Sequence, residues 1–219
     1  MNELPPLYLA SASPQRRDIL GELGFAFTVV PAPGVAEVLL ADPAATVREN
    51  AKRKAVGARL PSPGAAGVVI AADTVMVAAD GSVMGKPVTS EHAAEYLRRI
   101  SGRRVRVCTG IAVWHPAAGR GAAAVAWSAA KLKPMTDAEI AWYVATGEPL
   151  TRAGAFGISR RGEIFVDSLE GEYSCFAGLP KRSLYAVLSA VLPGHPALPP
   201  VGADDGIAVE FFTAPAAEA

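Results

Sequence analysis

Short apolar runs and helix-start signals alternate along the chain, and this pattern predicts a mixture of strands and helices. Strands are expected where a run rich in Val, Ile, Leu and Ala is bounded by turn residues. Helices are expected where a capping residue or a proline opens a segment. The expected strands are residues 7–10, 25–30, 68–77, 105–114 and 122–132. The expected helices are residues 14–23, 46–60, 90–100, 136–145 and 180–191.

The order of these elements predicts an α/β protein with a mixed, twisted sheet and flanking helices. Strands 105–114 and 122–132 are expected to be antiparallel, because only the Gly-rich loop 117–121 joins them. Asp80-Gly81 predicts a hairpin turn after strand 68–77.

The last part of the chain differs in composition from the rest. Residues 1–192 are expected to form one domain, and 193–219 a Pro-rich C-terminal tail. A loose tail is the favoured interpretation, and an edge strand at 207–212 is the alternative.

Composition narrows the class of protein. Hydrophobic residues make up 51% of the 219, which is enough for a full core and excludes disorder for most of the chain. Lys+Arg and Asp+Glu are both 21, so the net charge is zero, which argues against a nucleic-acid partner. No apolar stretch approaches the roughly 20 residues of a membrane helix, and no signal peptide is recognised. A soluble, cytoplasmic protein without a membrane partner is expected.

Cysteine and histidine positions argue against two kinds of site. Cys108 and Cys175 are far apart, without the Cys/His spacing of a zinc site, and a reduced state is expected. The three histidines, His92, His115 and His195, do not accompany a plausible Ser or Cys nucleophile, which argues against a catalytic triad.

Ser11-Ala-Ser-Pro-Gln-Arg16-Arg17 is a candidate anion site. Strand 7–10 ends in two serines, and the helix that follows begins with basic residues, where cations are electrostatically disfavoured. Backbone N–H groups, hydroxyls and guanidinium groups that converge there would suit a phosphate. A capped helix with solvent-facing arginines explains the same pattern, so both interpretations stay open.

Asp73 is a candidate general base or metal ligand. It interrupts the apolar run 68–77, and a buried charge is costly unless it is paired or bound to a metal. An Asp that caps a turn at a strand end is the alternative. Lys86 lies between Gly85 and Pro87 and is a candidate phosphate contact, although the spacing from Gly81 is wrong for a P-loop.

Several motifs occur together in an order that resembles the Maf family, the septum-formation-inhibitor-like nucleoside triphosphate pyrophosphatases. The resemblance covers about residues 7–191. The motifs are Ser11-Ala-Ser-Pro-Gln-Arg16-Arg, Ala71-Ala-Asp-Thr74, Gly85-Lys-Pro87, Ser101-Gly-Arg103, Thr109-Gly110, Gly147-Glu-Pro149, Ala153-Gly-Ala-Phe-Gly157 and Gly178-Leu-Pro180.

The resemblance implies a fold of two lobes around a central cleft, like that of inosine-triphosphate pyrophosphatases. It implies hydrolysis of a nucleoside triphosphate to the monophosphate and pyrophosphate, with Mg²⁺ or Mn²⁺. Asp73 and Glu37 would be the catalytic and metal-binding carboxylates, and whether Asp73 acts as base or as metal ligand stays open. Residues that match the phosphate-binding set are Ser11, Arg16, Lys54 and Lys86.

The positions that set base preference in the family are only partly kept. The dTTP/UTP branch usually has Arg, Thr and Gln where this chain has Gln15, Thr74 and Ser159, and Arg152 replaces a typical Lys. The branch that acts on 7-methyl-GTP usually has Trp and Gln at the first two of these positions. The Ala-Gly-Ala-Phe-Gly-Ile run favours the pyrimidine branch.

The hypothesis is a cytoplasmic, metal-dependent nucleoside triphosphate pyrophosphatase that acts on dTTP, UTP or modified nucleotides. A 7-methyl-GTP-type or relaxed-specificity pyrophosphatase is one alternative. A nucleotide-binding regulator of cell division with little turnover is the alternative of another class. Assembly as a homodimer is left open.

Overall fold

The computed structural model describes residues 4–62, 64–199 and 206–214. Within these residues, eight strands form one mixed sheet in the order β2-β1-β3-β5-β6-β7, with β4 paired to β3 and β8 paired to β6. The strands are β1 Leu7–Leu9, β2 Phe27–Val29, β3 Val68–Val77, β4 Val83–Met84, β5 Arg104–His115, β6 Arg120–Leu132, β7 Val166–Glu170 and β8 Val209–Thr213. The mixed α/β fold predicted from the sequence is confirmed.

Six α-helices and several short 3₁₀ helices accompany this sheet in the described residues. The α-helices are α1 Pro14–Glu22, α2 Pro43–Val56, α3 Ser90–Ile100, α4 Asp137–Ala145, α5 Tyr173–Phe176 and α6 Lys181–Val191. The 3₁₀ helices are Pro116–Ala118, Glu148–Thr151, Ala153–Ala155 and Arg160–Phe165. None of the helices described is long and apolar enough to cross a membrane.

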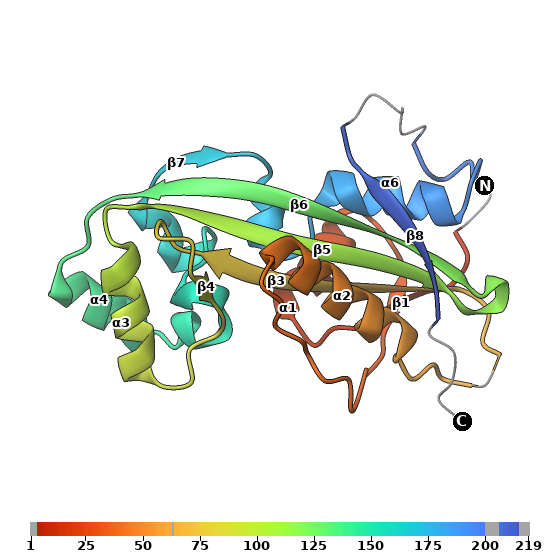
Figure 1. Cartoon of the computed structure of the whole chain (residues 1–219), viewed down its shortest axis with the longest axis horizontal. Coiled ribbons are helices and arrows are strands. Elements are labelled where there is room, and N and C mark those ends of the chain that lie inside the picture. Colours follow the sequence, from red (N-terminus) through yellow and green to blue (C-terminus); the bar gives the residue numbers. More distant parts are fainter. Residues whose placement is uncertain (1–3, 63, 200–205, 215–219) are drawn as a thin grey trace.

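The molecule is elongated and has two lobes (Figure 1). Strands β5 and β6 run along its whole length and join the lobes. At one end, α2 covers one face of the sheet, and α1 and α6 cover the other. At the other end, α3, α4 and β4 form a smaller lobe with its own apolar core, which includes Leu97, Leu132, Ile140 and Tyr143.

Most of the sequence-predicted elements are confirmed. Strand 68–77 and helix 90–100 have the predicted bounds, and β5 and β6 pair antiparallel from Arg104 to His115. Helix α4 begins with the predicted capping box, in which Thr136 and Glu139 satisfy each other's backbone N–H groups.

The predicted start of α2 at Thr46 is wrong. The helix begins at Pro43, because the side chain of Asp42 accepts hydrogen bonds from the backbone nitrogens of Ala44 and Ala45, both at 3.1 Å. The hydroxyl of Thr46 instead accepts from the backbone nitrogen of Leu40 at 2.9 Å and ties down the preceding loop. Pro43 fits the first helical position, because the backbone N–H that it lacks would have no partner within the helix there.

The loose tail favoured for the C-terminal segment is wrong for residues 209–213. These residues form β8, which pairs antiparallel with β6. Its side chains alternate, so Val209 packs into one core of the larger lobe and Phe212 into the core on the opposite face. Part of the tail, residues 200–205 and 215–219, lies outside the described residues.

Candidate active site

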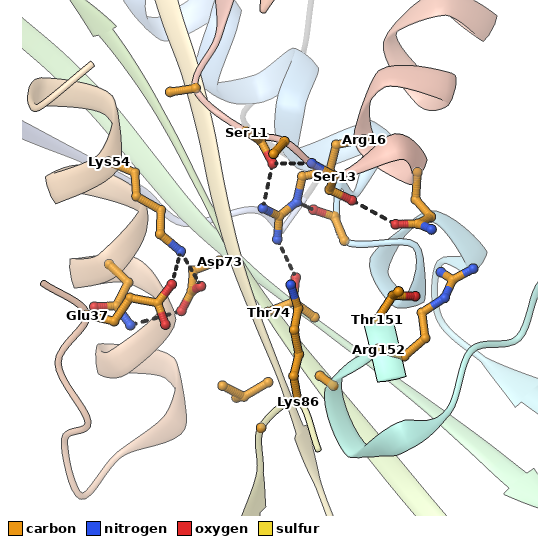
Figure 2. A pocket seen from close by; sticks show the side chains of 18 of the residues that line it. Ser11, Ser13, Arg16, Glu37, Lys54, Asp73, Thr74, Lys86, Thr151 and Arg152 are labelled. Carbon is orange, nitrogen blue, oxygen red and sulfur yellow. Dashed lines mark hydrogen bonds and ion pairs between the residues drawn. The ribbon is translucent and has the colours of Figure 1, made fainter. Parts of the chain in front are cut away.

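A cleft of about 1270 Å³ lies between the two lobes. The loop after β1, the loop before α2 and α2 itself line it on the side of the larger lobe. The turn after β4 and the segment 150–156 line it on the side of the smaller lobe. Strand β3 crosses between them (Figure 2).

The cleft opens onto an uncovered stretch of β3. Strand β1 pairs with β3 only as far as Ile70, and β4 pairs with it only from Met76 onward. Among the described residues, no strand pairs with 71–75 on that side. Asp73 and Thr74 lie in this gap, and because successive side chains alternate they point to opposite faces of the sheet. The gap therefore presents both side chains to one cleft.

The carboxylate of Asp73 is held by two side chains of α2. Lys54 Nζ lies 2.7 Å from Asp73 Oδ1, and Asn50 Nδ2 donates to Asp73 Oδ2 at 2.9 Å. Lys54 Nζ also lies 2.6 Å from Glu37 Oε1, so one ammonium bridges both carboxylates (Figure 2). Asp73 is 8% exposed, whereas Glu37 stands exposed in the loop before α2. The structure thus brings Asp73 and Glu37, the two candidate catalytic carboxylates, together with Lys54, a candidate phosphate contact.

Helix α2 comes close enough for these contacts because of Gly110. Gly110 lies opposite Asp73 in the pairing of β3 with β5. A Cβ at this position would lie 2.4 Å from the carbonyl oxygen of Val47, so any larger residue would push α2 away from the sheet. The glycine thus sets the distance between the helix and Asp73.

Sequence reasoning missed Asn50. Its Oδ1 accepts from the backbone nitrogen of Val38 at 2.8 Å, and its Nδ2 donates to the oxygen of Val38 at 3.0 Å and to Asp73. Asn50 is 3% exposed and links Asp73 to the loop that carries Glu37. Asn is a weak helix former, and here it stands four residues before Lys54, which puts both side chains on one side of the helix. That position is the signal that could have identified Asn50.

Arg16 lies on the other face of β3. Its Nη1 donates to Ser11 Oγ at 3.1 Å, its Nε to the backbone oxygen of Gly178 at 2.8 Å, and its Nη2 to Thr74 Oγ1 at 3.2 Å. The solvent-facing alternative is therefore wrong for Arg16, whereas Arg17 is exposed. Burial lowers the pKa of the Arg16 guanidinium, and the carboxylates of Asp73 and Glu37 act in the opposite direction.

Thr74 connects Arg16 to a chain of hydrogen bonds that continues through Thr109 to Cys175. Thr109 Oγ1 donates to the backbone oxygen of Cys175 at 3.0 Å, so it can only accept from Thr74 Oγ1, which lies 3.0 Å away. Thr74 therefore presents a lone pair, not a proton, to Arg16. This arrangement fixes the plane of the guanidinium.

Ser11 and Lys86, two of the four predicted phosphate contacts, differ in their surroundings. Ser11 lines the cleft and also accepts from the backbone nitrogen of Ser13 at 3.2 Å. Lys86 is exposed in the turn after β4 and also lines the cleft. Figure 2 shows Lys86 on the opposite side of β3 from Lys54. Cations thus approach the cleft from both lobes.

Ser159 does not line the cleft, although Gln15 and Thr74 do. Its hydroxyl accepts from Arg152 Nη2 at 3.2 Å, and Arg152 itself lines the cleft. Arg152 is 6% exposed, and its Nε has no hydrogen-bond partner in the described part of the chain. Glu148 Oε1 lies 3.9 Å from Arg152 Nη2. Ser159, one of the three positions expected to set base preference, is thus linked to the cleft through the buried side chain of Arg152.

The donor set at Asp73 is compatible with one Mg²⁺ or Mn²⁺ ion shared with a substrate. Among the described residues, no group of three or more His, Cys, Asp and Glu side chains could hold a metal by itself. Mg²⁺ at phosphate-transfer sites usually takes one or two carboxylates, with phosphate and water oxygens completing the shell. Asp73 and Glu37 supply that number of carboxylates at one place.

Comparison with known proteins relates the chain to one family. The family model described as Maf-like protein matches residues 6–191. A dTTP/UTP pyrophosphatase of Salinibacter ruber is 43% identical over 189 residues, which are 84% of this chain and 90% of that protein. A dTTP/UTP pyrophosphatase of Anaeromyxobacter dehalogenans is 42% identical over 186 residues, 84% of this chain and 93% of that protein. The solved Ham1 protein of Staphylococcus aureus aligns with a TM-score of 0.45 and 14% identity, over 86% of this chain and 98% of that one.

Proposed function

The chain belongs to the Maf family, and we propose that it hydrolyses nucleoside triphosphates to the nucleoside monophosphate and pyrophosphate. The observation that carries the proposal is the carboxylate of Asp73, fixed by Lys54 and Asn50 at the open edge of β3. Cationic side chains of both lobes border the same cleft. A triphosphate carries about four negative charges, and such a cleft can neutralise them.

In this proposal, water attacks the α-phosphorus, and the bond from that phosphorus to the bridging oxygen breaks. The water oxygen stays with the nucleoside monophosphate, and the bridging oxygen leaves with pyrophosphate. Asp73 accepts the proton of the water: each carboxylate oxygen has two lone pairs, so its bonds to Lys54 and Asn50 leave acceptor capacity. Arg16 and Lys86 neutralise charge on the phosphates.

Asp73 and Glu37 are the residues that would hold a divalent cation. When bound, Mg²⁺ or Mn²⁺ would screen the charge on the phosphate oxygens. Lys54 holds the two carboxylates at one place, because without an intervening cation their charges would repel each other.

For the base, we propose a preference for dTTP and UTP. Two observations support this preference. The relatives from Salinibacter ruber and Anaeromyxobacter dehalogenans are named dTTP/UTP pyrophosphatases, and the buried side chain of Arg152 lines the cleft. A guanidinium can only donate, so it favours bases that present carbonyl oxygens and disfavours the amino group of cytosine. Ser159, held by Arg152, would influence the preference through that arginine.

We place this activity in the cytoplasm, where it would remove excess or non-standard nucleotides. The free, buried thiols of Cys108 and Cys175 are compatible with a reducing compartment. A regulator of cell division with little turnover is less well supported, because such a role does not require Asp73, Glu37 and Lys54 to meet.

The proposal is tested with a panel of dTTP, UTP, CTP, GTP, dATP and 7-methyl-GTP in the presence of Mg²⁺ or Mn²⁺. Pyrophosphate release should be fastest with dTTP and UTP. Fastest release from 7-methyl-GTP would contradict the base preference and leave the reaction type in place. No release from any member would contradict the enzyme proposal.

A further inference from the structure

Strand β8 lies beyond residues 6–191, the part matched by the family model, and it reaches α2. On the face of β8 that points toward α2 are Glu210 and Phe212, whereas Val209 packs in the core on the opposite face. Phe211 is 61% exposed. Strand β8 therefore presents one acidic and one aromatic side chain to the helix that carries Asn50 and Lys54.

Gly121 leaves space on the sheet for the ring of Phe212. Gly121 of β6 pairs with Trp114 of β5 on one side and with Phe212 on the other. A Cβ on Gly121 would lie 2.5 Å from the ring of Phe212. Because that Cβ is missing, the rings of Phe212 and Trp114 stack across the glycine, with centroids 5.7 Å apart and planes 21° apart.

Glu210 pairs with two cations of α2. Its Oε2 lies 3.2 Å from Arg48 Nε, and its Oε1 bonds to Lys52 Nζ. The ammonium of Lys52 also lies 5.5 Å from the centroid of the Phe212 ring. The hydrogen bond from Lys52 lowers the pKa of the Glu210 carboxyl, and the nearby charges of Lys52 and Arg48 act in the same direction.

These contacts are on the side of α2 that faces away from Asp73. Arg48 and Lys52 are four residues apart and share one side of the helix, as Asn50 and Lys54 share another. At about 100° per residue, the offset of two residues places the two sides nearly opposite each other. Helix α2 is thus held from β8 on one side and from Asp73 on the other.

We infer that Glu210 and Phe212 are positioning residues, which hold α2 where Asn50 and Lys54 reach Asp73. The inference rests on the proposed pyrophosphatase function. The hydrogen bonds to Asp73 are 2.7 and 2.9 Å long, so a sideways shift of α2 by about 1 Å would break them. Misplacement of this size at a catalytic group can lower rates by as much as about 100-fold.

The test compares Glu210→Gln and Phe212→Ala with Phe211→Ala, which changes an aromatic residue of the same strand that points away from α2. The Glu210 side chain is 48% exposed, so Glu210→Gln removes only a surface ion pair and should leave the chain folded. We measure kcat and KM for pyrophosphate release at 25 °C, and hydrogen exchange of the α2 amides.

We expect kcat to fall about 3-fold in Glu210→Gln and about 10-fold in Phe212→Ala, with KM changed less than kcat. Exchange of the α2 amides should become faster in both variants. Phe211→Ala should match the wild type in both measurements. The expected fall in kcat reflects a displaced Lys54 and Asn50, not a loss of folded protein.

A lower melting temperature with an unchanged kcat would overturn the inference, because β8 would then be a merely structural strand. A lower kcat with unchanged exchange in α2 would overturn it too. These outcomes require a wild-type chain that releases pyrophosphate. Without that release, the proposed function fails and this inference fails with it.

Discussion

Lys54 Nζ lies 2.7 Å from Asp73 Oδ1, so a helix residue neutralises a strand residue at the bottom of the cleft. The same ammonium contacts Glu37 at 2.6 Å. Both the Lys54 and the Asp73 side chain are largely buried, at 17% and 11% exposure. Truncating one partner of such a pair leaves an uncompensated charge, which makes Lys54 a sensitive position.

Lys54→Ala should lower kcat/KM for pyrophosphate release by about 100-fold, because it leaves the carboxylates of Asp73 and Glu37 in mutual repulsion. Lys54→Arg should not restore the activity, since a planar guanidinium does not replace a compact ammonium between two carboxylates. The control is Arg53→Ala, which breaks an exposed pair with Glu49. A fully active Lys54→Ala enzyme would contradict its role.

Asp73→Asn should lower kcat by about 100-fold or more, as expected for loss of a general base. The amide keeps the shape of the side chain, so circular dichroism should be unchanged. Asp80→Asn is the matched control, because Asp80 is exposed in a turn and pairs with Arg99 outside the cleft. Near-normal turnover by Asp73→Asn would move the catalytic role to another residue.

Arg152 should determine how well the enzyme discriminates UTP from CTP. Arg152→Gln should lower the ratio of kcat/KM for UTP over CTP by about 10-fold, because a glutamine can accept as well as donate. Ser159→Ala should change the ratio in the same direction by less, since it loosens Arg152 without removing it. The exposed Arg161 provides the control, Arg161→Gln. An unchanged ratio in both cleft variants would refute this role.

The two cysteines should be unreactive in the native protein. Burial raises the pKa of the Cys175 thiol to about 11 and that of Cys108 further. At pH 8, about one Cys175 in a thousand is then a thiolate, the reactive form. A thiol reagent such as dithionitrobenzoate should label neither cysteine at pH 8 and both in urea.

The raised pKa of a buried thiol also makes the stability of the protein depend on pH. A thiol pKa that is higher in the folded than in the unfolded chain stabilises the protein below the unfolded value of about 8.5. That contribution is lost as the pH rises through the folded value. Stability should therefore fall from about pH 8.5 to 11, and the fall should be smaller in Cys175→Ala. Rapid labelling of one native thiol at pH 8 would contradict the burial of both.

The sequence predicted best those elements whose signals are local. The continuous apolar run of 68–77 and the capping box at Thr136 and Glu139 depend on neighbouring residues, and both are confirmed. Strand β7 and helix α5 were missed, because their residues carry no clear periodicity and their pairing partners are distant. Strand β8 depends on Trp114 and Gly121, which are about 90 residues away.

Part of the site also depends on distant contacts. The charge of Asp73 in an apolar strand was enough to make that residue a candidate without any structure. Arg16 could not be assigned from pattern alone, because its partners Thr74 and Gly178 are 58 and 162 residues away. Ser159 was expected to be one of the positions that set base preference, and in the structure Arg152, which accounts for its link to the cleft, lines the cleft in its place.

In the reaction that we propose, water attacks the α-phosphorus of a nucleoside triphosphate beside Asp73. Product analysis of dTTP hydrolysis by phosphorus NMR, with Mg²⁺ and with Asp73→Asn as the blank, tests it most directly. We predict dTMP and pyrophosphate in equal amounts from the wild type. Formation of dTDP and inorganic phosphate would contradict the claim, since a different bond would then be broken.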